Sequence, residues 1–150
     1  MNLEQIDLVK ESFRLASPRI DEVAQRFYAD LFERHPEMRS LFPDDLTTQR
    51  VKLAHELAAI VDALDRLREL VALTTELGAR HAAYGVAPEH YQLVGESLRA
   101  ALAAVLGDRY DTDVDTAWRL AYNLVAETMA FGAAGTGLPD QARLGGRVAG

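Results

Sequence analysis

Residues 20–36 read IDEVAQRFYADLFERHP, and this stretch decides the fold class. Its apolar side chains recur at steps of three and four residues, which is the period of a helix with one buried face. Proline disfavours helical geometry in the residue before it, so His35-Pro36 predicts the end of this helix. The residues of the predicted buried face are Ile20, Val23, Ala24, Phe27, Tyr28 and Leu31.

The same spacing recurs on both sides of this helix. Asn2 and Gln5 predict a capped first helix, and Ser17-Pro18 predicts its end. The alternation of apolar and polar residues that marks half-buried strands is absent. The pattern therefore predicts an all-α chain of about six to eight helices. After a corner at 42–45, helices are expected over 46–64, over 65–83 as one helix or two short ones, over 88–107 and over 112–131.

The composition fits one domain with an ordinary core. The chain has 150 residues, of which 49% are apolar, and none is cysteine. The absence of cysteine excludes disulfides, thiolate zinc sites, iron–sulfur clusters and cysteine nucleophiles. The chain carries 16 Lys and Arg against 23 Asp and Glu, a formal charge of −7. This acidic balance disfavours nucleic acid as a partner, because phosphates require clustered basic side chains.

The sequence also indicates where the protein works and how it divides. Residues 1–13 lack the basic start and apolar run of a secretory signal. The longest apolar run, 100–106, is far shorter than the ~20 residues of a membrane-spanning helix. We therefore expect a cytoplasmic protein without a membrane partner. We expect a domain over 1–132 and, because glycine is frequent beyond it, a frayed or disordered tail over 133–150.

Three polar residues fall at positions that the helical pattern buries: Tyr28, Gln49 and His81. If they share one cavity, they would surround a ligand. His81 is the sharpest candidate, because neutral imidazole is a common axial ligand of haem iron. The alternative for His81 is an ordinary surface or core histidine. Tyr28 could equally be a core aromatic residue with its hydroxyl on a carbonyl, and Gln49 could be solvated.

Four strings of residues, taken in order, carry a resemblance to a known family. They resemble the bacterial single-domain haemoglobins and the globin domains of flavohaemoglobins, over residues 3–131. The resemblance implies a globin fold with its helices packed around a haem b pocket. The strings are Phe27-Tyr28-x-x-Leu31-Phe32-x-x-His35-Pro36, Leu41-Phe42, Gln49-x-x-x-Leu53, and His81-x-x-Tyr84-Gly85-Val86-x-x-Glu89-His90-Tyr91-x-x-Val94-Gly95.

The resemblance implies a role for each matching residue. It implies that His81 binds the iron on the proximal side, and that Tyr28 and Gln49 form the distal pair that hydrogen-bonds the gas ligand. Leu53 matches the apolar residue over the iron, and Phe42 matches the aromatic residue that packs on the porphyrin. For Leu53 and Phe42, ordinary core packing is the alternative interpretation.

Further residues complete the expected pocket. Tyr91 matches the tyrosine whose hydroxyl reaches the proximal histidine, with core packing again as the alternative. Arg80 and Lys52 are candidates to pair with haem propionates, although exposed cations are the ordinary interpretation. The apolar residues that spacing places toward the macrocycle are Leu77, Val86, Val94, Val125 and Met129.

One position departs from the family pattern. The flavohaemoglobin-type domains carry a glutamate on the last helix behind the proximal histidine, and its place here falls on Ala133, with Glu127 too early in the helix. The resemblance implies reversible binding of oxygen, and of nitric oxide and carbon monoxide, for storage, delivery or sensing. The first alternative is a nitric oxide dioxygenase that uses an external reductase, because the chain lacks a glycine-rich nucleotide motif. The second is a haem-free sensor module, against which stands the cost of burying an unpaired imidazole.

Overall fold

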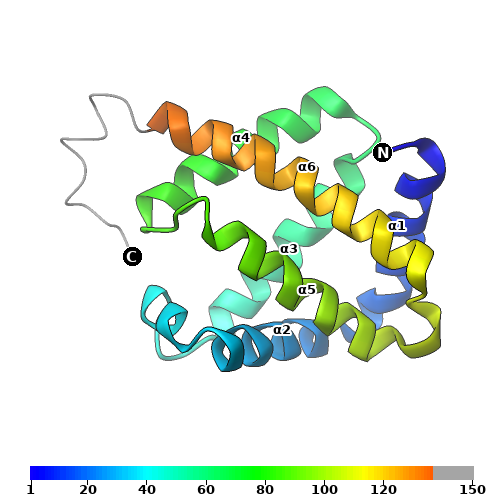
Figure 1. Ribbon diagram of the computed structural model, residues 1–150, viewed down its shortest axis with the longest axis horizontal. Coiled ribbons are helices and arrows are strands. Elements are labelled where there is room, and N and C mark those ends of the chain that lie inside the picture. The colour runs from blue at the N-terminus through cyan, green and yellow to red at the C-terminus, as the bar shows by residue number, and fades with distance from the viewer. Residues whose placement is uncertain (137–150) are drawn as a thin grey trace.

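The computed structural model describes residues 1–136, and in this part of the chain all regular structure is helical. Figure 1 shows the path of the chain. The predicted all-α class is confirmed, and the segment predicted as one helix or two forms a single helix, α4. The α-helices are α1 (Leu3–Ala16), α2 (Ile20–Arg34), α3 (Thr47–Ala63), α4 (Leu67–Ala83), α5 (His90–Leu106) and α6 (Thr112–Thr136), with short 3₁₀ turns η1 (Ser17–Arg19), η2 (Pro36–Leu41) and η3 (Gly107–Arg109).

Local chemistry fixes the helix ends. The Asn2 side chain accepts a hydrogen bond from the Gln5 backbone N–H at 2.8 Å, and the Gln5 side chain accepts one from the Asn2 N–H at 2.9 Å, so α1 begins with the predicted capping box. At the other end of the domain, α5 stops at Gly107, whose φ of 59° favours glycine. Asp111 then accepts a hydrogen bond from the Val114 N–H and starts α6.

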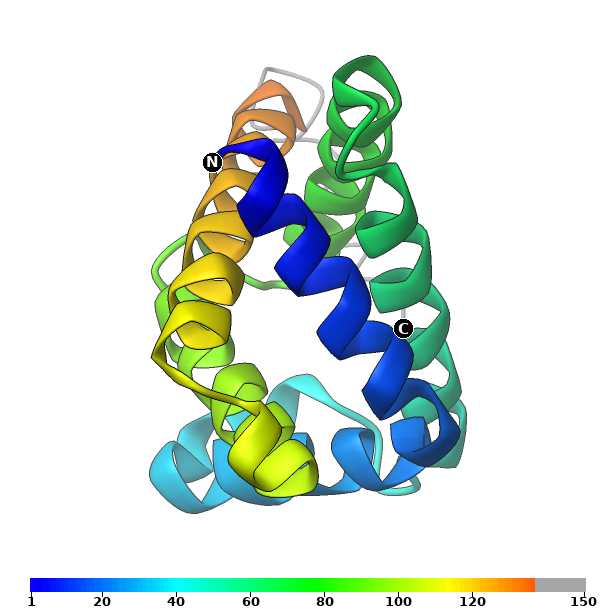
Figure 2. The same ribbon diagram turned by 90° about the vertical axis from the view of Figure 1, so that its right-hand side faces the viewer.

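The helices pack in crossing pairs. Helix α4 lies along α6, and α2 lies along α5. Figure 1 shows α2 along one edge of the molecule, with α5 and α6 beyond it. Figure 2 shows α1 crossing between α6 and α3, which it contacts on its two sides. Because each helix buries one face against at least one other helix, a single core forms.

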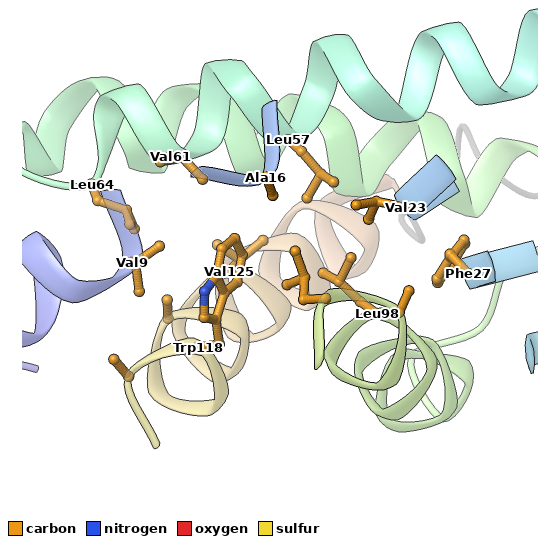
Figure 3. Packing of buried hydrophobic residues seen from close by; sticks show 14 of the residues in the cluster. Val9, Ala16, Val23, Phe27, Leu57, Val61, Leu64, Leu98, Trp118 and Val125 are labelled. Atoms are coloured by element: carbon orange, nitrogen blue, oxygen red, sulfur yellow. The ribbon is translucent and has the colours of Figure 1, made fainter. Parts of the chain in front are cut away.

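The core gathers the apolar faces that the sequence pattern predicts. Figure 3 shows Leu57 of α3, and Leu64 just after the end of that helix, facing the region where Trp118 and Val125 of α6 lie. The Trp118 indole N–H donates to the buried Ser12 hydroxyl at 2.8 Å, and that hydroxyl donates to a carbonyl of its own helix. The indole therefore keeps a hydrogen bond although it is only 4% exposed, and this bond fixes α1 against α6.

Helices α4 and α6 approach to backbone contact. A Cβ atom placed on Gly78 would overlap the Met129 carbonyl group, and one placed on Gly132 would overlap the Thr75 carbonyl group. The hydroxyl of Thr74 is hydrogen-bonded to that of Thr128 beside these contacts. Small residues thus let the two backbones meet, and this contact sets the position of α4 against α6.

Helix α6 continues to Thr136, past the predicted end at residue 131, so residues 133–136 of the expected tail are helical. Residues 137–150 lie outside the described part of the chain, and the expectation of a frayed or disordered tail there remains a prediction. Within residues 1–136, the helices are too short or too polar to cross a bilayer.

Candidate functional site

His81 lies in the last turn of α4 with its ring half-buried. Its Nδ1 atom is 2.8 Å from the Leu77 carbonyl oxygen, one turn earlier. A carbonyl oxygen only accepts hydrogen bonds, so Nδ1 carries the proton and donates. The neutral ring then keeps its lone pair on Nε2, which is the atom that can bind a metal.

The turn after α4 holds the His81 backbone. Its carbonyl oxygen accepts hydrogen bonds from the N–H groups of Tyr84 and Val86, both at 3.0 Å. Gly85 permits this turn, because its φ of 91° is strained for other residues. A Cβ placed on Gly85 would lie 3.8 Å from the Leu41 side chain at the end of η2. The turn beside His81 and the corner after η2 are therefore neighbours in space.

An aromatic cluster forms on that corner. The ring centroid of Tyr28 lies 5.5 Å from that of Phe42, 5.9 Å from that of Phe32 and 4.8 Å from that of Phe27. The guanidinium of Arg39 lies 5.1 Å from the Phe32 ring centroid. These distances are typical of favourable aromatic and cation–π pairs. The fold thus brings together Tyr28 and Phe42, two of the predicted site residues.

Arg39 also fixes the backbone of the corner. Its guanidinium donates to the carbonyl oxygens of Phe42 at 3.3 Å, Pro43 at 2.8 Å and Asp44 at 2.9 Å. Asp45 accepts hydrogen bonds from the backbone N–H and the hydroxyl of Thr47, and so begins α3. The corner that carries Phe42 is therefore held by side chains on both sides.

The Tyr28 hydroxyl stays protonated at neutral pH. Burial raises the pKa of Tyr28 to about 12, since the residue is only 5% exposed. The negative charge of Glu56 also raises this pKa, while a hydrogen bond with Gln49 lowers it. Gln49 and Glu56 therefore both lie near the Tyr28 hydroxyl, which offers a hydrogen-bond donor.

Six apolar side chains of the corner, α3, the turn after α4 and α5 pack on the core yet remain partly exposed, as residues that contact an apolar ligand would be. The Tyr91 hydroxyl is buried without a hydrogen-bond partner among the described residues. Together with the half-buried imidazole of His81, these apolar side chains are of the types that hold a haem group. The partly exposed residues are Leu41, Phe42, Leu46, Leu53, Val86 and Val94.

The other candidate residues take different positions. Leu77, Val125 and Met129 are buried in the core. Lys52 is exposed on α3. Tyr91 is 6% exposed, and burial raises the pKa of its hydroxyl, but the hydrogen bond of His81 goes to Leu77. The Tyr91 hydroxyl has no hydrogen-bond partner among the described residues, and its expected contact with His81 would compete with the bond between Nδ1 and Leu77.

Arg80 is engaged by two carboxylates. Its guanidinium nitrogens lie 3.8 Å from Glu76 on its own helix and 3.8 Å from Glu56 on α3. Sequence reasoning missed Glu56 as a residue near the site. The available signal was its spacing, because Gln49, Leu53 and Glu56 follow one another at steps of four and three along α3.

Comparison with known proteins agrees with this geometry. Residues 25–129 match the family model of the globins. The flavohemoprotein of Bacillus subtilis is 31% identical over 125 residues, which cover 81% of this chain and 31% of the relative. The chain thus spans about a third of the length of such relatives. An uncharacterized globin-like protein of Aquifex aeolicus is 33% identical over 84% of this chain and 89% of its own.

A solved structure extends the comparison to almost the whole chain. It is an engineered carbene transferase from Rhodothermus marinus, described as a candidate nitric oxide dioxygenase. It is 31% identical, superposes with a TM-score of 0.82, and the match covers 97% of this chain and 99% of the other. The fold, the match to the family model and these identities lead to one conclusion. This chain belongs to the globin family.

Proposed function

We propose that this globin binds haem b through His81 and reversibly binds oxygen and other diatomic gases for storage, delivery or sensing. The observation that carries the proposal is the orientation of His81. Its Nδ1–H is committed to the Leu77 carbonyl, which leaves the Nε2 lone pair for iron. The names of the flavohemoprotein relatives support haem as the group bound. Haem, when bound, supplies a ferrous iron that coordinates the gas.

The chain's own residues would set the lifetime of the gas complex. Tyr28 keeps its proton because its pKa is about 12, and so it can donate a hydrogen bond to a polar gas ligand. Gln49 lies close enough to orient that hydroxyl or to donate as well. The partly exposed apolar side chains, including Leu53, Val86 and Val94, would pack on the macrocycle and exclude water.

A nitric oxide dioxygenase is the second candidate, because a relative that matches nearly the whole chain is described as a candidate for this activity. Turnover would need an external reductase as partner. The hydrogen bond of His81 favours the first function. A neutral carbonyl makes the imidazole a weaker electron donor than a carboxylate would, and strong donation favours oxygen activation.

Hemin titration tests the proposed function. The wild-type protein should take up one hemin per chain with a sharp Soret band, and His81→Ala should lose high-affinity retention. His55→Ala is the matched control, because His55 is exposed on α3. Normal coordination in the His81 variant, or a colourless wild type that refuses hemin, would refute the proposal.

A second experiment separates the two candidate functions. The oxygenated protein is mixed with nitric oxide in a stopped-flow instrument, and steady-state nitrate production is then measured with a general flavin reductase. Rapid reaction in a single turnover is common to both functions. Sustained turnover at a rate near that of the single event would identify the dioxygenase, and its absence supports the gas binder.

A further inference from the structure

Helices α3 and α4 form a hairpin that is joined at residues 64–66, between Ala63 and Leu67. Figure 1 shows α4 turning back from the end of α3. Gln49 and Leu53 lie near the start of α3, and His81 lies near the end of α4. The residues proposed to face the two sides of haem are thus on the far arms of the hairpin, away from the joint.

One ion pair links the two arms. The Glu56 carboxylate lies 3.8 Å from the Arg80 guanidinium. Within residues 1–136, this pair is the sole hydrogen bond or ion pair between side chains of α3 and α4. Arg80 immediately precedes His81, and Glu56 follows Leu53 by one turn. The pair therefore closes the hairpin beside the residues that would hold haem.

The pair is partly exposed, so its importance lies in its position. The Glu56 side chain is 32% exposed and that of Arg80 is 48% exposed. The negative charge of Glu56 raises the pKa of Tyr28, so this carboxylate lies near the Tyr28 hydroxyl. Glu76, the other partner of Arg80, lies four residues earlier on the same helix and links nothing across the hairpin.

We propose that Glu56 and Arg80 form a clasp across the opening between α3 and α4, which slows haem entry into the ligand-free protein. The proposal rests on the proposed function, since it assigns the opening to haem. Entry requires the arms of the hairpin to separate, and separation breaks the pair. The pair acts on the separation of the two helices, so neither residue needs to touch the gas.

The test follows hemin uptake by the ligand-free protein, through quenching of Trp118 fluorescence. We expect Glu56→Gln, Arg80→Gln and the double variant each to accelerate uptake by about two- to fivefold, the range that partly exposed ion pairs usually contribute. The three variants should be equal, because each removes the same pair. Glu76→Gln is the matched control and should leave the rate unchanged.

Arg80→Gln separates a clasp from simple attraction. Hemin carries negative propionates, so the loss of a positive charge near the opening slows uptake if long-range attraction dominates. Slower uptake in Arg80→Gln combined with faster uptake in Glu56→Gln would therefore overturn the clasp. An unchanged rate in Glu56→Gln would overturn it as well.

Hydrogen exchange of the ligand-free protein gives a readout without haem. Glu56→Gln should speed amide exchange in the first half of α3, and Glu76→Gln should not. Unchanged exchange in Glu56→Gln would count against the clasp. A wild-type protein that takes up no hemin would instead refute the proposed function, so the two failures are distinguishable.

Discussion

The Nδ1 atom of His81 lies 2.8 Å from the carbonyl oxygen of Leu77, and this bond determines which nitrogen of the imidazole is free to bind a metal. Both atoms belong to α4, so the ring orientation is set within one helix turn. The bond needs no help from the distal side of the pocket. A metal bound at Nε2 would therefore have a ligand that is oriented before the metal arrives.

Replacement of Tyr91 by phenylalanine tests whether another group shares this imidazole. With Nδ1 committed to Leu77, we expect the iron–histidine stretch of the hemin-loaded, reduced Tyr91→Phe protein to match the wild type in resonance Raman spectra. A shifted stretch would show that the Tyr91 hydroxyl reaches His81 when haem is bound. It would also strengthen the case for the dioxygenase.

Tyr91 and Tyr122 should respond in opposite ways to loss of their hydroxyls. The Tyr91 hydroxyl is buried without a partner, so Tyr91→Phe should stabilise the ligand-free protein by about 1 kcal/mol. The Tyr122 hydroxyl donates to the Tyr91 carbonyl at 2.6 Å, so Tyr122→Phe should destabilise it by about 1 kcal/mol. Urea unfolding measures both. Equal losses in the two variants would contradict this assignment.

Alkaline pH should destabilise the fold through Tyr28. Its folded pKa of about 12 lies above the unfolded value near 10, so the protonated form is favoured on folding. The stabilisation is complete below about pH 10 and is lost as the pH rises toward 12, at up to about 1.4 kcal/mol per pH unit. Chemical unfolding of wild type and Tyr28→Phe across this pH range should show that the free energy of unfolding declines less steeply in the variant. Tyr84→Phe, at an exposed residue, should follow the wild type.

The Tyr28 hydroxyl should also control gas release. Loss of a donor to a polar ligand costs about 1–3 kcal/mol, so Tyr28→Phe should raise the oxygen dissociation rate by roughly five- to a hundredfold. Carbon monoxide is the internal comparison, because it is a poorer hydrogen-bond acceptor and should respond less. Stopped-flow ligand replacement gives both rates. An unchanged oxygen rate would mean that the hydroxyl does not face the ligand.

Gly78 should tolerate no side chain. A Cβ there meets the Met129 backbone, and a backbone of two packed helices cannot shift as a side chain can. We expect Gly78→Ala to lower the free energy of unfolding by about 3 kcal/mol or more, seen as a large drop in Tm. Ala72→Ser, at an exposed residue of the same helix, should change it little. A stable Gly78→Ala protein would refute the close contact.

The helices were predictable because apolar periodicity is local. The faces led by Val23 in α2 and by Trp118 in α6 are buried as their spacing predicts. The end of α6 was not predictable, because it depends on contact with another helix rather than on local sequence. Gly132 of α6 packs against the Thr75 carbonyl of α4, and the helix continues to Thr136.

The site was predictable in its residue types and less so in its connections. Spacing places Tyr28, Gln49 and His81 inward, yet it could not show that His81 bonds to Leu77, because Nδ1 has several acceptors within reach of a helix end. The pair between Glu56 and Arg80 joins residues 24 positions apart on two helices. Such contacts depend on the crossing of the helices, which a single sequence does not specify.

The backbone contact between α4 and α6 has a mechanical consequence. Met129 and Gly132 touch α4 directly through Gly78 and Thr75, without flexible side chains between them. Close-packed backbones transmit displacement rather than absorb it. A displacement of the imidazole at position 81 would therefore be transmitted to the carboxyl-terminal half of α6. Helix α3 packs less extensively on α4 than α6 does. It would therefore move less, and the distance between α3 and α4 would change.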